Sequence, residues 1–178
     1  MQEAERRRLS LELTPFFGGL EAAAFDRILA MLAPRVHGAG AVVFREGDPG
    51  RSLYVVGEGR LMKWQSGDSG RQVKHMRLEA GDFFGEMELI EIQPRQFTVV
   101  SETPSLLYEL TNRDLYRLYQ EDVHAYVMVL QNINRELCRN IRKAHDRITE
   151  HAEQLGEEVT QIVAGIGHVR RQVIDDKK

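Results

Sequence analysis

Cysteine is almost absent from the chain, and Cys138 is the only one. A single thiol excludes an intramolecular disulfide and any metal site built from several cysteines. Long apolar runs are also missing, since no stretch approaches the ~18 consecutive apolar residues that a membrane span requires. The N-terminal residues MQEAERRR are charged and lack the apolar core of a secretion signal. These absences predict a cytoplasmic protein without a membrane partner.

The sequence patterns of catalysis and of metal binding are missing as well. The chain has no nucleophile elbow, no phosphate-loop lysine motif and no pair of suitably spaced acids. His145 and His151 stand six residues apart, which places them on different faces of a helix. We therefore expect no catalytic residue, no metal ligand and no resident cofactor. The net charge of −3 excludes a surface that is basic throughout, although it leaves room for a local basic patch. DNA is not expected as a partner.

Glycine is unevenly distributed along the chain. Ten of the 15 glycines lie between Gly38 and Gly85, and none lies in 86–155. Dense glycine among short apolar runs predicts short strands joined by tight turns, whereas a glycine-free stretch favours helix. Strands are expected at 41–44, 53–56, 61–65, 73–78, 97–100 and 106–110. Short strands at such close and even spacing favour a jelly-roll β-barrel.

Helices are expected on both sides of these strands. Residues 10–33 are expected to be helical: residues 20–32 carry apolar side chains at helical spacing, and Pro34 should stop that helix. Thr111 or Asn112 is a plausible N-cap for a short helix, and a long helix should follow from about Val123. The apolar residues of its second half keep the three–four spacing of a heptad repeat, which one small domain cannot bury. We therefore expect a coiled-coil-like seam and a homodimer.

These expectations divide the chain into three parts. Residues 1–34 form an N-terminal helical segment, 35–111 the β-barrel, and 112–178 the C-terminal helices with a coiled-coil-like tail. The predicted fold class is α+β, mainly β: a jelly-roll barrel with N-terminal helices and a long C-terminal dimerisation helix.

The most informative segment is 81–99, with the sequence GDFFGEMELIEIQPRQFTV. A short helical turn should begin near Gly85 and end before Pro94, because the residue before a proline disfavours helix. The start of such a turn presents free N–H groups to an anion. Arg95 could fork onto two oxygens of one phosphate, and Glu86 could accept a hydrogen bond from a sugar hydroxyl. Together these features predict a site for a nucleotide sugar phosphate.

This segment resembles the phosphate-binding cassette of the cyclic nucleotide-binding domain family. That family includes the bacterial cyclic AMP receptor protein and the regulatory subunits of cyclic AMP-dependent protein kinase. The matching stretches are FGEMELI at 84–90 and PRQFTV at 94–99, and the nine-residue step from Glu86 to Arg95 is usual in the family. Upstream, residues 44–61 resemble the family's first barrel glycines. The resemblance covers residues 11–150 and implies the family's jelly-roll fold.

The resemblance also implies a role for each matching position. Arg95 would pair with the cyclic phosphate, and Glu86 would hold the ribose 2′-hydroxyl. In dimeric bacterial members the long helix caps the base, and alignment places that contact at Asn140. The expected ligand-binding residues are Phe84, Gly85, Glu86, Met87, Glu88, Pro94, Arg95, Gln96, Phe97 and Asn140.

Two positions depart from the family pattern. Glu88 stands where the family usually has a small residue beside the phosphate, and a carboxylate there would repel the ligand unless it points outward. Gln96 replaces the small or hydroxyl residue that follows the arginine. A threonine at that place favours cyclic GMP in the family, so its absence favours cyclic AMP over cyclic GMP.

The expected function is therefore non-catalytic sensing of a cyclic AMP-type nucleotide. Ligand binding would be coupled to the long dimer helix, which would offer a surface to an effector protein. Two alternatives remain open. One is a ligand-free dimeric scaffold, and the other is a Crp/Fnr-type transcription regulator that is truncated, since the residues after His151 leave no room for a winged helix-turn-helix domain.

Overall fold

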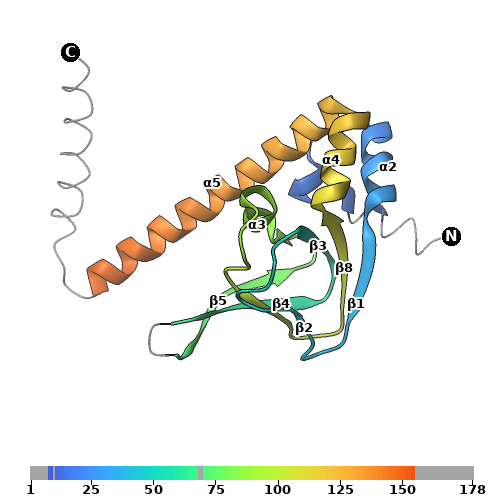
Figure 1. Cartoon of the computed structure of the whole chain (residues 1–178). Helices are drawn as coiled ribbons and strands as arrows, with labels where there is room; N and C mark the ends of the chain where they lie inside the picture. Colours follow the sequence, from blue (N-terminus) through green and yellow to red (C-terminus); the bar gives the residue numbers. More distant parts are fainter. Residues whose placement is uncertain (1–7, 10, 68–69, 155–178) are drawn as a thin grey trace, which may run out of the picture. The chain divides into compact units, whose positions relative to one another are not determined.

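The computed structural model describes residues 8–9, 11–67 and 70–154 of the chain (Figure 1). They fall into two compact units, one that ends at Asn134 and one that begins at Arg135. Within these ranges, no helix combines the length and the apolar character that a membrane crossing needs.

The first unit contains two antiparallel sheets, which together hold the eight strands found in the described ranges (Figure 1). One sheet has the order β1 (Ala33–His37), β8 (Ser105–Thr111), β3 (Ser52–Glu58) and β6 (Phe83–Phe84). The other has the order β2 (Val42–Phe44), β7 (Thr98–Ser101), β4 (Arg60–Ser66) and β5 (Gln72–Glu79). Strands β1 to β4 alternate between the two sheets, and so do β5 to β8, which is jelly-roll topology. The predicted jelly-roll barrel is confirmed.

The barrel core is formed by inward-facing side chains of both sheets. Its fully buried members are Val56, Leu61, Leu78, Phe84, Val99 and Leu107. Each such side chain contributes roughly 1.5–3 kcal/mol when it leaves water. Because the core draws on six different strands, neither sheet is stable without the other.

All six predicted strands are present, and two further strands were not predicted from the sequence. Strand β1 begins at Ala33, so Pro34 belongs to a strand and not only to the end of a helix. Because β1 lies at the edge of its sheet, Pro34 is tolerated although it cannot donate a hydrogen bond. Strand β6 has only two residues, which is too short for a periodicity signal.

The prediction that residues 10–33 are helical is wrong for part of that range. The structure has a 3-10 turn, η1 (Pro15–Phe17), and a separate helix, α2 (Ala22–Met31). Gly19 lies between η1 and α2 and has a φ of 74°, which is a left-handed conformation. The Nδ2 atom of Asn132 donates to the carbonyl oxygens of Phe16 (2.9 Å) and Gly18 (2.8 Å) and so holds the connecting segment in place.

The short helix after the barrel begins as predicted. Helix α4 (Asn112–Glu121) has Thr111 as its N-cap, and the cap is reciprocal. The Asp114 backbone N–H donates to Thr111 Oγ1 (3.2 Å), and the Thr111 N–H donates to the Asp114 carboxylate (2.9 Å). Helix α5 (Val123–Gln154) follows. Its first turns bury Ala125, Val129 and Ile133 at a four-residue spacing.

The second unit contains residues 135–154 of α5 among its described residues. Ile141 and Ile148, seven positions apart, are both exposed there. Ala152, a further apolar position of the expected seam, is buried. The later expected positions, Leu155, Val159, Ile162, Ile166, Val169 and Val173, lie outside the described residues.

Candidate functional site

A short helix, α3 (Glu86–Glu91), follows β6 inside the segment 81–99. Its N-cap is Gly85, which has a φ of 80°. A Cβ atom at Gly85 would lie 2.6 Å from Nη1 of Arg95 and 3.0 Å from the Ser52 carbonyl oxygen, so only glycine fits. At the other end Ile92 adopts a left-handed conformation that β-branched residues rarely take. The predicted helical turn before Pro94 is confirmed.

The backbone of Arg95 is held by the loop that follows β2. The Arg95 N–H donates to the Asp48 carbonyl oxygen, and the Gly47 N–H donates to the Arg95 carbonyl oxygen, both at 2.8 Å. Asp48 also fixes its own turn, because its carboxylate accepts from the Arg45 N–H at 2.7 Å. Two loops distant in sequence thus form a short antiparallel pair that positions Arg95.

The guanidinium of Arg95 points into the protein. Its Nη2 atom donates to the carbonyl oxygen of Ser52 (2.7 Å) and to Ser52 Oγ (3.2 Å). Its Nη1 atom donates to the carbonyl oxygen of Gly85 (3.3 Å). The Arg95 guanidinium therefore bonds both to strand β3 and to the start of α3, and so links the segment 81–99 to the barrel.

Aromatic rings surround the same cation. The Arg95 Cζ atom lies 4.1 Å from the ring centroid of Phe44 and 5.8 Å from that of Tyr54. Phe84 stacks on Tyr54 with centroids 5.4 Å apart. Such rings attract a guanidinium through their negative faces. Burial also raises the pKa of the Tyr54 phenol, because it disfavours the charged phenolate.

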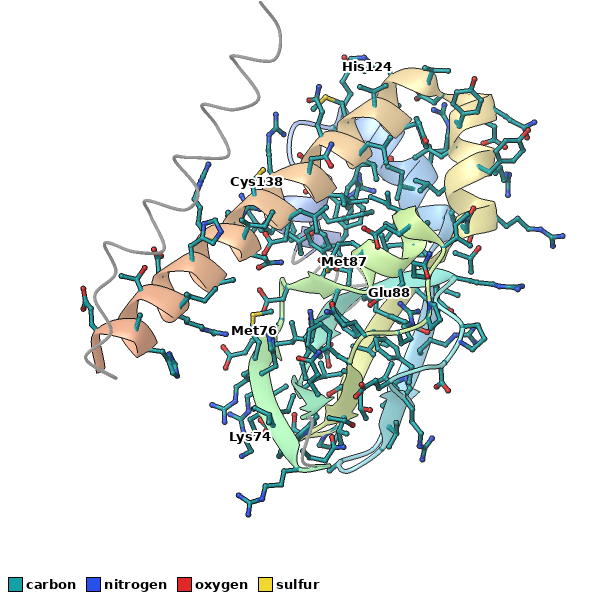
Figure 2. The ribbon with its side chains drawn as sticks, turned by 60° about the vertical axis from the view of Figure 1, so that its left-hand side comes forward. Lys74, Met76, Met87, Glu88, His124 and Cys138 are labelled. Atoms are coloured by element: carbon teal, nitrogen blue, oxygen red, sulfur yellow. The ribbon has the colours of Figure 1, made fainter. Side chains whose placement is uncertain are left out.

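Glu88 points inward and pairs with Arg95. Its Oε2 atom lies 3.3 Å from Arg95 Nη1, and its Oε1 atom accepts from the Gln96 N–H at 3.1 Å. The side chain of Arg95 is 2% exposed and that of Glu88 is 8% exposed, without their backbone atoms. Figure 2 labels Glu88 on α3 beside Met87. The Glu88 carboxylate therefore does not point outward, which is the orientation that would avoid repulsion of an anionic ligand.

The other expected ligand-binding residues divide into buried and exposed sets. Glu86 is 3% exposed, and Phe84 is fully buried. Met87 is 39% exposed, and the side chains of Pro94 and Gln96 are also exposed. The structure thus brings Gly85 and Glu88 into contact with Arg95 and packs Phe84 against the two rings that flank it. By contrast, Met87, Pro94 and Gln96 lie at the surface. Asn140 belongs to the second unit.

Phe97 lies at the end of the cassette and is half-buried. Its ring contacts the imidazole of His75 (4.6 Å between centroids), and the Lys63 Nζ atom lies 5.5 Å from its centroid. Lys63 is only 9% exposed and follows Leu61 at the two-residue spacing of one strand face. The charge in the apolar run LMKW of β4 was a signal that sequence reasoning passed over.

Ser52, Phe44 and Tyr54 were also missed from the sequence. They lie in ordinary strands, and only the fold shows that their groups converge on Arg95. The two-residue alternation of Ser52 and Tyr54 places them on one face of β3, but it does not identify what that face meets.

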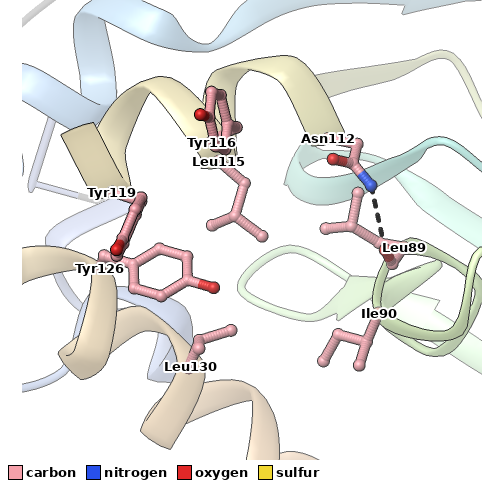
Figure 3. Close-up of a pocket in the computed structure, with 8 residues that line it drawn as sticks. All are labelled: Leu89, Ile90, Asn112, Leu115, Tyr116, Tyr119, Tyr126 and Leu130. Atoms are coloured by element: carbon pink, nitrogen blue, oxygen red, sulfur yellow. Dashed lines mark hydrogen bonds between the residues drawn. The ribbon is translucent and has the colours of Figure 1, made fainter. Parts of the chain in front are cut away.

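A separate pocket of about 420 Å³ lies beside the cassette helix (Figure 3). It is lined by Leu89, Ile90, Asn112, Leu115, Tyr116, Tyr119, Tyr126 and Leu130. The Asn112 side chain donates to the Leu89 carbonyl oxygen at 3.4 Å and so links α3 to the first residue of α4. Nothing in the sequence predicted this pocket, because its walls come from three helices.

Metal ligation has no support in the part of the chain that the structure describes. No group of three histidine, cysteine, aspartate or glutamate side chains there lies close enough to hold one ion.

Comparison with known proteins gives a consistent result for this region. The family model described as "Cyclic nucleotide-binding domain" matches residues 34–122. The cyclic AMP receptor protein of Thermus thermophilus is 27% identical over 135 residues, which are 74% of this chain and 59% of that protein. A cyclic nucleotide-gated potassium channel of Rhizobium etli is 33% identical over 129 residues, 72% of this chain and 31% of the channel. The chain thus spans less than two thirds of either relative.

Solved structures resemble the fold as well. The catabolite activator protein of Thermus thermophilus aligns with a TM-score of 0.70 at 26% identity, over 78% of this chain and 63% of that one. A cyclic nucleotide-binding domain from Methylobacillus flagellatus aligns with a TM-score of 0.76 at 21% identity, over 84% of both chains. The second likeness concerns the fold alone.

Proposed function

Since the chain belongs to the cyclic nucleotide-binding domain family, we propose that it is a non-catalytic regulator that binds a cyclic nucleotide inside its jelly roll. Arg95 holds the cyclic phosphate, and Glu86 accepts a hydrogen bond from the ribose 2′-hydroxyl. The N–H groups at the start of α3 complete the contact with the phosphate, and Phe84, Met87 and Phe97 line the ligand site.

One observation carries this proposal: Arg95 and Glu86, two charged residues of the matching cassette, are each 3% exposed. Burial of charge is costly unless hydrogen bonds compensate for it. Charged groups held in a desolvated position are typical of functional sites. Among the expected ligand-binding residues these two are also the ones whose chemistry suits a phosphate and a sugar hydroxyl.

We infer a preference for cyclic AMP over cyclic GMP from the residue after the arginine. Gln96 stands where a threonine would favour the guanine base, and its backbone N–H is already engaged by Glu88. Asn140, which carries both a donor and an acceptor, is proposed to contact the base edge.

The output of the regulator is proposed to pass through α5 to a homodimer. The first turns of α5 are anchored in the barrel unit through Ala125, Val129 and Ile133, and the exposed Ile141 and Ile148 continue the seam. A ligand that binds one arrangement of barrel and helix better than another shifts the population by that difference in affinity. An effector protein would then recognise the favoured dimer surface.

A ligand-dependent thermal melt tests the proposal directly. Cyclic AMP, cyclic GMP and a cyclic dinucleotide are each added to the full chain, and the ligand at about 100 times its dissociation constant should stabilise it by roughly 2.7 kcal/mol. Cyclic AMP should give the largest shift. Unchanged melting with all three ligands at millimolar concentration contradicts the proposal.

The base contact has its own test. Asn140→Ala should weaken cyclic AMP binding in a calorimetric titration, whereas Gln131→Ala, at an exposed polar position of the same helix, should not. Equal affinities for the two variants would remove Asn140 from the site.

The Glu88–Arg95 pair favours a second candidate function, a scaffold that binds no nucleotide. The cation is already neutralised within the protein, so the barrel could serve only to present α5 to a partner. This candidate predicts a stable oligomer in light scattering whose size does not respond to nucleotide. A monomer at micromolar concentrations would contradict it.

A further inference from the structure

We propose that Glu88 is a specificity-determining residue of the same site: its carboxylate occupies Arg95 and competes with the phosphate of the ligand. This inference rests on the proposed function, because it concerns how the cyclic nucleotide gains access to Arg95. It assigns a role to the position at which the chain departs from the usual family pattern.

The hydrogen-bonding capacity of Arg95 leads to this inference. Each of its two terminal nitrogens carries two N–H groups. In the structure Nη2 contacts the two oxygens of Ser52, and Nη1 contacts the Gly85 carbonyl oxygen and Glu88. Four donors therefore meet four acceptors. The remaining donor, Nε–H, is buried and has no acceptor among the described residues.

A phosphate that forks onto a guanidinium needs two N–H groups on one edge. Because the terminal N–H groups are taken, the phosphate must displace at least one oxygen. Two of the four are backbone carbonyl oxygens, fixed by strand β3 and by the start of α3, and the Ser52 hydroxyl lies on the same strand. Of the four acceptors, the Glu88 carboxylate is the one on a long side chain. Rotation of that side chain can withdraw it from Arg95.

Charge points to the same acceptor. The carboxylate and the phosphate are both anions, and their repulsion is strong where water is excluded. The two cannot share the guanidinium as readily as a phosphate and a neutral carbonyl can. The bound phosphate therefore replaces Glu88, and the affinity for any phosphate-bearing ligand is lowered by the strength of the internal pair.

The Glu88–Arg95 pair discriminates between ligands by their charge. Cyclic AMP has to displace Glu88, whereas adenosine, which has the same base and sugar without the phosphate, does not. Removal of the Glu88 charge should therefore tighten cyclic AMP binding and leave adenosine binding unchanged.

The experiment is a calorimetric titration of the full chain with each of the two ligands. The variants are wild type, Glu88→Gln and Glu91→Gln, the last being a matched control because Glu91 is an exposed carboxylate of the same helix. Glutamine at 88 keeps an oxygen for the Gln96 N–H but carries no charge. Glu88→Gln should bind cyclic AMP about tenfold more tightly than wild type. Glu91→Gln should match wild type, and adenosine binding, including none, should be equal in all three.

Glu88→Ser provides a second variant in case the glutamine chain does not fold, with folding checked by a melt without ligand. Equal or weaker cyclic AMP binding in both folded Glu88 variants overturns the inference while leaving the proposed function intact. Tightening of cyclic AMP and adenosine alike also overturns it, because the effect would then not concern the phosphate. Absence of cyclic AMP binding in wild type and in the Glu88 variants overturns the proposed function itself.

Discussion

Gly50 packs directly against Glu88: a Cβ atom built on Gly50 would stand 2.3 Å from the Glu88 Cβ atom and 2.5 Å from the Gln93 carbonyl oxygen. Neither atom is the end of a flexible side chain, so a larger residue would push α3 away from the loop. The position of the Glu88 carboxylate thus depends on Gly50, in the loop between β2 and β3 that packs against Glu88.

Gly50→Ala should therefore destabilise the protein by about 1–3 kcal/mol, the usual cost of an overpacked contact. The measurement is the free energy of unfolding in urea. Gly38→Ala is the control, because a Cβ atom there meets nothing within 4 Å and the backbone is not left-handed. Equal destabilisation by both substitutions would mean that the contact with Glu88 has no energetic weight.

Arg95→Ala should cost about 3–5 kcal/mol, because it leaves the buried Glu88 carboxylate without its counter-ion. Adding Glu88→Gln to this variant should recover part of the loss, since no charge then remains unpaired. Chemical denaturation of the wild type, both single variants and the double variant measures the coupling between the two residues. Additive losses would show that the pair is not coupled.

Leu89→Ala should destabilise the protein by about 2–5 kcal/mol, because Leu89 is a buried side chain of α3 and its truncation leaves a cavity. Ile90→Ala removes a comparable volume from an exposed position of the same helix and should cost much less. The melting temperatures of the two variants make the comparison. Similar melting temperatures would contradict the packing seen around α3.

Tyr54 should make stability depend on pH in the alkaline range. Burial raises the pKa of its phenol above the ordinary value of 10.0, so folding favours the neutral form. Its contribution is complete below pH 10.0 and is lost as the pH rises through the folded-state pKa. Tyr54→Phe should lack this alkaline loss.

The check on Tyr54 is the free energy of unfolding against pH for wild type and Tyr54→Phe. Tyr116→Phe serves as the control, because that side chain is exposed. Parallel curves for wild type and Tyr54→Phe up to strongly alkaline pH would contradict the burial of the phenol.

The barrel could be predicted because its strands obey rules that act over a few residues. The glycine-punctuated apolar runs gave six of the strands, and the Thr111 cap gave the start of α4. By contrast, β1 and β6 depend on pairing with β8 and β3, which lie far away in sequence. The break at Gly19 was missed because the helical spacing of residues 20–32 was extended back to residue 10.

The site was predictable only in part, and for a similar reason. The cassette motif identified Arg95 and Glu86 as the charged residues to examine. The direction of Glu88 follows from the approach of Gly50 and from the Gln96 N–H, which no local pattern encodes. The aromatic surroundings of the guanidinium likewise need the folded barrel, because Phe44 and Tyr54 come from different sheets.

The tyrosine-lined pocket equips the molecule with optical reporters that need no dye. Tyr116, Tyr119 and Tyr126 share that pocket with Leu89 of the cassette helix, while the one tryptophan of the chain, Trp64, lies on β4 with the Lys74 ammonium over its ring. Trp64 can be excited alone at the long-wavelength edge of the absorption band, whereas shorter wavelengths excite Trp64 and all five tyrosines together. A change around the β4–β5 hairpin can therefore be followed by selective tryptophan excitation in an unlabelled sample, and the pocket tyrosines can be followed in a Trp64→Phe background.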